Sequence, residues 1–191
     1  MPTGSVSAAM SPTLEESAAL MGGFRWVETR LFELLGAWVP SAGEPEVMAM
    51  LDRHSQHAAW RAAQWWDRLP VVASIDRPSL VRAPSAGYEA AVEVLGQDGL
   101  ALVERLAGAY RVLFAHLAVG YRGLRAAATP WSDGPVMRTL GHVVPDLIED
   151  WLEGEAALQS MLTVATDSGA GAELAYGVAA RLESLLVDDP R

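Results

Sequence analysis

Apolar side chains recur every three or four positions over four long segments of the chain, which is the period of an amphipathic α-helix. These segments span about residues 12–39, 45–69, 98–128 and 134–163. Short links containing proline or glycine join the first segment to the second and the third to the fourth. Each pair is therefore expected to fold back on itself as an antiparallel hairpin. The pattern predicts an all-α protein built from two helical hairpins of similar length.

The segment between the two hairpins differs from them in composition. Residues 70–85 read PVVASIDRPSLVRAPS, with three prolines that exclude a continuous helix, and a short helix is expected at residues 88–95. A connection of this length can run from one end of a bundle to the other, so that the second and third long helices are parallel. That is the connectivity of a ferritin-like four-helix bundle with a long crossover. The alternative is a simple up-down bundle in which this segment is a long, irregular loop.

Apolar positions continue beyond the fourth segment, and about residues 172–187 predict an extra C-terminal helix. The chain is then expected to divide into a flexible leader (1–11), a helical bundle (12–165), and a linker with the C-terminal helix (166–191). The neighbours Trp65 and Trp66 cannot both face one core, so one of them is expected to meet the crossover, a partner or solvent. This surplus apolar surface, together with the C-terminal helix, predicts a homodimer.

The composition argues against several classes of function. The net charge of −10 opposes non-specific binding of nucleic acid. The absence of cysteine excludes disulfides, iron–sulfur clusters and thiolate zinc sites. No apolar run is long enough for a membrane-spanning helix, and residues 1–11 lack the features of a signal peptide, so a cytoplasmic location is expected. We see no glycine-rich phosphate loop, and neither a nucleotide nor haem is expected.

Four candidate residues fall at the same height of the predicted bundle. Each lies about 11 or 12 residues from the link of its own hairpin, which is roughly 17 Å along a helix. Carboxylates and imidazoles that meet at mid-height are what a helical bundle needs in order to hold a pair of metal ions. The four residues are Glu28, His57, His116 and Asp146.

Three segments carry a family resemblance: GGFRWVETRLFELLGAWV, LDRHSQHAAWRAAQWWDRLP and LGHVVPDLIEDWLEGEAALQSML. Together with the crossover they resemble ferritin-like proteins of high-GC bacteria, in the superfamily that includes the ferritin-like tRNA hydroxylases. The resemblance covers about residues 20–162. It implies a four-helix bundle that in many relatives holds two iron ions, bridged by carboxylates, which activate O₂.

The resemblance also implies a ligand set, with one Glu on each of two helices and Glu-x-x-His on each of the other two. Here the second helix carries His54-x-x-His57, the third has no Glu at mid-height, and the fourth carries Asp146-x-x-Glu149. Tyr110, on the inner face of the third helix, is expected to donate a hydrogen bond close to the metal. The candidate ligands are Glu28, His54, His57, His116, Asp146 and Glu149.

Each candidate also has a structural interpretation without metal. A buried Glu28 needs a partner, which is either a metal ion or a side chain such as His57, Arg61 or Tyr110. The two histidines of the second helix fit a hydrogen-bonded core pair equally well, and a lone histidine on the third helix is more often structural. The acidic residues of the fourth helix fit a solvated charged face, unless Pro145 turns that face inward.

Two functions follow from these alternatives. The first is a ferritin-like, non-haem iron oxidoreductase or oxygenase, with two irons, acting on a small organic substrate. The second is a non-catalytic, metal-free bundle that serves as a structural or partner-binding module. An enzyme acting on nucleic acid is disfavoured by the negative net charge.

Overall fold

The protein is described by a computed structural model that covers residues 13–73, 75–164 and 169–187. Every secondary-structure element within these residues is helical, which confirms the all-α prediction. None of the described helices combines the length and apolar character that a membrane crossing needs. The predicted leader of residues 1–11, and residues 165–168 of the predicted bundle end and linker, lie outside the described part. The elements are α1 (Leu14–Trp38), η1 (Val39–Ser41), α2 (Pro45–Arg68), η2 (Arg77–Leu80), α3 (Ala86–Leu95), α4 (Leu102–Leu106), η3 (Ala107–Leu113), α5 (Phe114–Ala127), α6 (Gly134–Val164) and α7 (Ala170–Val187).

Local sequence explains where the first hairpin begins and ends. The Thr13 hydroxyl accepts a hydrogen bond from the Glu16 backbone N–H, and the Glu16 carboxylate accepts one from the backbone N–H of Thr13. This capping box satisfies two N–H groups that the first turn leaves free. Pro45 stands in the first turn of α2, where its missing N–H costs nothing. The helix ends at Arg68, and the next residue, Leu69, is extended because Pro70 follows it.

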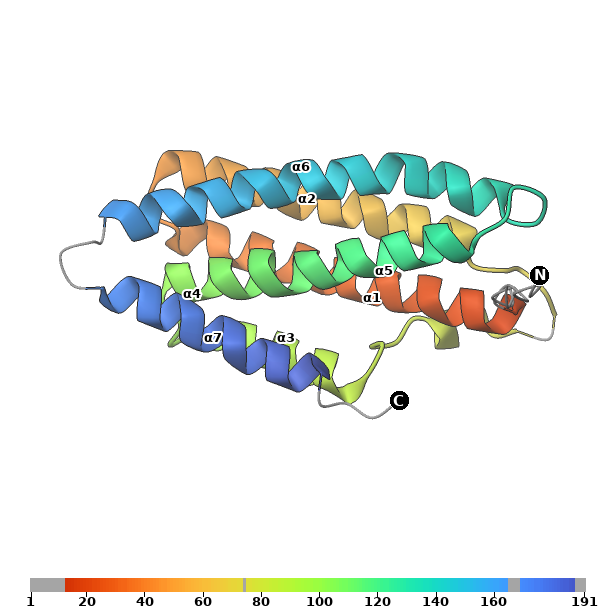
Figure 1. Cartoon of the computed structure of the whole chain (residues 1–191), viewed down its shortest axis with the longest axis horizontal. Helices are drawn as coiled ribbons and strands as arrows, with labels where there is room; N and C mark the ends of the chain where they lie inside the picture. The colour runs from red at the N-terminus through yellow and green to blue at the C-terminus, as the bar shows by residue number, and fades with distance from the viewer. Residues whose placement is uncertain (1–12, 74, 165–168, 188–191) are drawn as a thin grey trace, which may run out of the picture.

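The long helices form a bundle in which the chain crosses over once (Figure 1). Helix α1 packs antiparallel to α2, and α5 packs antiparallel to α6; α2 also contacts α6, and α1 contacts α5. Residues 69–101 carry the chain back along the bundle before the third long helix begins. The second and third long helices therefore run in the same direction, as the proline-rich joint predicts, and not in the alternating order of a simple up-down bundle.

Trp66 anchors the crossover to the bundle. The guanidinium of Arg77, on the crossover, lies 4.1 Å from the centre of the Trp66 ring, and that of Arg25 lies 4.6 Å from it. Arg77 also donates a hydrogen bond to the backbone carbonyl of Trp66. Cation–π contacts of this kind stabilise by about 0.5–2 kcal/mol each. Trp65 is fully buried instead, so the prediction that the two tryptophans separate is confirmed.

The third long helix is not the regular α-helix that its apolar stripe predicts. It begins at Leu102 after Ala101, not at Asp98, and Glu104 caps it by accepting from the Ala101 backbone N–H. Residues 107–113 then form the π-helical segment η3 before α-helical geometry resumes in α5. A π turn inserts an extra residue into the helix and is often found at functional sites. Here it contains Tyr110, which is fully buried.

The C-terminal helix packs on its own chain. Ala175, Val178 and Leu182 are buried, and α7 lies against α3, α4 and η3. The approach is close, because a Cβ on Gly87 would lie 2.1 Å from the carbonyl oxygen of Leu185. These contacts and those of Trp66 account for much of the apolar surface behind the homodimer prediction, which stays a prediction.

The contact between α6 and η3 can be tested at Gly154. A Cβ at this position would lie 2.3 Å from Cε1 of Tyr110, so Gly154→Ala is expected to lower the free energy of unfolding by about 1–3 kcal/mol. Gly141→Ala, on the same helix with nothing within 4 Å of its added Cβ, is expected to raise it by about 0.5–1 kcal/mol. Denaturant unfolding measures both, and equal effects would contradict the close packing.

Candidate metal centre

A buried guanidinium lies at the centre of the polar core. Arg61, on α2, has no solvent exposure. Its Nε donates to Glu28 Oε1 on α1 at 2.8 Å, and its Nη1 donates to Oδ2 of Asp146 at 2.5 Å and of Asp150 at 2.7 Å, both on α6. Glu28 has no solvent exposure and Asp150 is 2% exposed, so this is a buried ion-pair network that joins three helices.

Two histidines extend the network along α2. The Nδ1 of His57 lies 2.8 Å from Asp150 Oδ1, and the Nε2 of His54 lies 3.4 Å from the same oxygen. His54 Nε2 is also 3.0 Å from Glu153 Oε2, and its Nδ1 is 2.8 Å from the hydroxyl of Tyr110. A neutral His54 meets both contacts when Nε2–H donates to Glu153 and the Tyr110 hydroxyl donates to Nδ1.

Glu28 reaches a second set of buried groups. Its Oε1 accepts from the Tyr121 hydroxyl at 2.6 Å, and that hydroxyl accepts from Trp65 Nε1 at 2.8 Å. The other oxygen, Glu28 Oε2, is buried and has no hydrogen-bond partner within the described residues, and the same holds for Nη2 of Arg61. A buried polar atom without a partner costs free energy, so these two atoms mark incomplete pairing at the centre.

Burial shifts the pKa values of several groups in the core. It raises the pKa of Glu28, against the opposing effect of Arg61, and it lowers the pKa of His54, against the attraction of Asp150. Burial also raises the pKa of Tyr110, so that its hydroxyl remains a donor. At the solvent edge, a hydrogen bond from Arg53 lowers the pKa of Glu153. The hydrogen bonds of Arg61 show that Glu28, Asp146 and Asp150 share one guanidinium.

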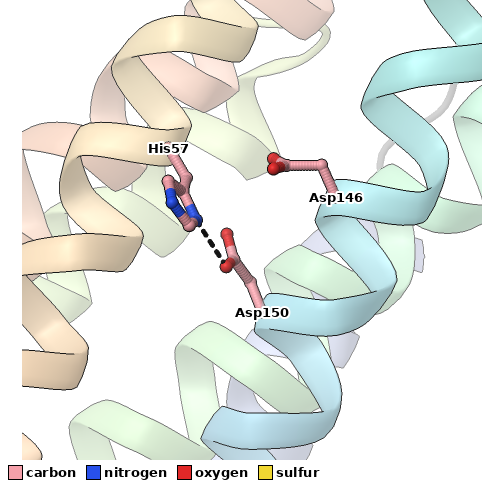
Figure 2. A group of neighbouring side chains, drawn as sticks. All are labelled: His57, Asp146 and Asp150. Carbon is pink, nitrogen blue, oxygen red and sulfur yellow. Dashed lines mark hydrogen bonds and ion pairs between the residues drawn. The ribbon is translucent and has the colours of Figure 1, made fainter.

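One group of side chains has the spacing of a metal site. His57, Asp146 and Asp150 each offer a ligand atom, and these atoms lie within 4.8 Å of one another, in the only such group found among the described residues. Figure 2 shows His57 on α2 facing the two aspartates on α6. The His57 and Asp146 side chains are 38% and 28% exposed, so the group lies at the edge of the core with one side toward solvent.

The predicted residues divide between this centre and other places. His57 and Asp146 belong to the metal-spaced group, and Glu28 and His54 lie in the network around it. Glu149 is exposed. His116 lies elsewhere, with Nε2 at 3.0 Å from Glu183 of α7, since equal height in a bundle does not mean the same face. The Tyr110 hydroxyl lies 2.8 Å from Nδ1 of His54, a histidine outside the metal-spaced group, so its predicted role beside a metal stays a prediction.

Two central residues were missed as site residues. Asp150 follows Leu147 by three positions and Val143 by seven, so the apolar stripe of the fourth helix contained the signal that it faces inward. Arg61 follows His57 by four positions and therefore shares its face, but the sequence alone suggests it only as one possible partner for Glu28. The interpretation of the fourth helix as a charged outer face drew attention away from Asp150.

A pair of iron ions does not fit this centre. The guanidinium of Arg61 is a permanent cation and already holds the carboxylates of Glu28, Asp146 and Asp150. The third long helix brings Tyr110 and Tyr121 to the network where the resemblance requires a Glu ligand. A single ion at His57, Asp146 and Asp150 leaves these contacts in place, and its donor set of nitrogen and oxygen is one that divalent transition metals accept.

Comparisons with protein-family models, with curated proteins and with solved structures gave no match to the chain. The geometry of this centre is therefore the basis for the proposed function.

The buried ion pair predicts that two glutamates of α1 contribute very different amounts to the free energy of unfolding. Glu28→Ala leaves Arg61 and Tyr121 without their shared acceptor, so it is expected to lower the free energy of unfolding by about 3–5 kcal/mol. Glu33→Ala removes a surface pair with Arg30, at 2.9 Å and with Glu33 48% exposed, and is expected to cost less than about 1 kcal/mol. Denaturant unfolding of both variants is the measurement, and a small effect at Glu28 would contradict the network.

Proposed function

We propose that this protein is a ferritin-like four-helix bundle whose core binds one divalent metal ion through His57, Asp146 and Asp150. The ferritin-like part is supported by the crossover, which leaves α2 and α4–α5 running in the same direction (Figure 1), and by the resemblance of residues 20–162. The metal part is supported by the spacing of the three side chains within 4.8 Å (Figure 2).

The observation that carries the proposal is the charge of the centre. Three carboxylates meet there, and among the described contacts only Arg61 brings them a permanent positive charge. Buried charge is costly unless it is neutralised. A divalent cation beside Asp146 and Asp150 supplies the two missing positive charges, and His57 adds a neutral nitrogen ligand.

The surrounding residues suit the support of such an ion. His54 lies within hydrogen-bonding reach of Glu153 and 3.4 Å from Asp150, and Tyr110 holds the other side of the His54 ring. Contacts of this kind orient metal ligands and tune their basicity. The exposed sides of His57 and Asp146 leave an approach for water or a small substrate.

A redox-active ion bound here would supply Lewis-acid and electron-transfer chemistry, which makes the proposed activity that of a metal-dependent oxidoreductase acting on a small organic substrate. This activity rests on the resemblance. The competing proposal is a metal-free bundle that serves as a structural or partner-binding module. It is favoured by one observation, namely that Arg61 already pairs with all three carboxylates.

Metal binding distinguishes the two proposals. The protein is dialysed separately against iron(II), manganese(II) and zinc(II), and bound metal is measured by plasma mass spectrometry and native mass spectrometry. We expect one ion per chain. His57→Ala and Asp146→Asn are expected to weaken binding at least ~10-fold, since even the loss of outer partners costs that much.

Two variants on α6 serve as matched controls. Glu149→Gln and His142→Ala change exposed side chains close to the centre and are expected to leave affinity unchanged. A wild-type chain that binds none of the three metals, or binding that is lost equally in the control variants, would favour the metal-free bundle.

A further inference from the structure

The two carboxylate oxygens of Asp150 face two different partners. Oδ1 lies 2.8 Å from Nδ1 of His57, on the side of the proposed metal ion, and Oδ2 lies 2.7 Å from Nη1 of Arg61. A carboxylate used in this way bridges two positions. One position is the proposed metal site, and the other is filled by a side chain of the protein.

The surroundings of the Arg61 guanidinium are those of a bound cation. Three oxygens from three different carboxylates contact it, at 2.8, 2.5 and 2.7 Å, and its side chain is completely buried. Glu28 is held incompletely, because its Oε2 is buried and has no hydrogen-bond partner within the described residues. A metal ion could take both oxygens of such a carboxylate.

We propose that Arg61 is a built-in second cation, which takes the place of a second metal ion and limits this bundle to one. The charges agree with this role. One divalent ion and one guanidinium together carry three positive charges, which match the carboxylates of Glu28, Asp146 and Asp150. Arg61 is then the residue that determines the metal capacity. The inference rests on the proposed function for the first ion, but it can fail independently.

The test counts manganese ions in variants of Arg61. The full chain is titrated with manganese(II) alone, bound metal is counted by native mass spectrometry, and electron paramagnetic resonance separates single ions from spin-coupled pairs. We expect one ion per chain in the wild type and two, with a coupled signal, in Arg61→Met and Arg61→Gln. Arg61→Lys keeps the charge and is expected to bind one ion.

Two further variants sharpen the result. Glu28→Ala in the Arg61→Met background removes the carboxylate that would belong only to the second ion, so it is expected to return the count to one. Arg111→Met is the matched control, since Arg111 pairs at 2.8 Å with Glu155, which is not one of the three carboxylates of the centre, and both side chains are 31% exposed. This variant is expected to bind one ion.

Each outcome decides between the claims. One ion in the wild type and still one in both neutral Arg61 variants overturns the inference and leaves the proposed function standing, and two ions in Arg61→Lys also overturn the inference. No ion in the wild type but binding in the neutral variants supports the inference and overturns the proposed function. If both neutral variants fail to fold even with excess manganese, a metal ion does not replace the guanidinium and the inference is wrong.

Discussion

The polar core of this protein depends on the burial of charge around Arg61. A guanidinium and two carboxylates with almost no solvent exposure, joined by a third carboxylate at the edge, can be tolerated only if each is paired. The pairs come from α1, α2 and α6, so the helices must meet at one height and with one rotation. Each of these pairs keeps hydrogen-bonding distance only in that arrangement. The same constraint leaves more negative than positive charge in the centre.

The remaining long helix contributes to this centre through aromatic side chains. The π-helical segment η3 contains Tyr110, whose hydroxyl contacts His54, and α5 contains Tyr121, whose hydroxyl donates to Glu28. Gly154 on α6 is the matching adaptation, because its missing side chain leaves room for the Tyr110 ring. The crossover makes this arrangement possible, since it allows the third long helix to run in the same direction as α2 (Figure 1).

The helical period and the proline-rich joint were enough to predict the hairpins and the relative direction of the two middle helices. Counting residues from the links also predicted that Glu28, His57 and Asp146 lie at one height, and all three belong to the network around Arg61 or Asp150. The same counting misplaced His116, because depth along a helix says nothing about its face. The π-helical segment was not predicted, because one extra residue shifts the apolar stripe by a single position, and a pattern of steps of three and four accommodates that shift.

The most direct test of a single metal ion beside Arg61 is anomalous diffraction at the manganese edge, from crystals grown with manganese(II). The account predicts one peak per chain, bounded by His57, Asp146 and Asp150, with Arg61 still bonded to Glu28. Two peaks at the centre, a peak in the place of the Arg61 guanidinium, or no peak beside His57 would contradict it.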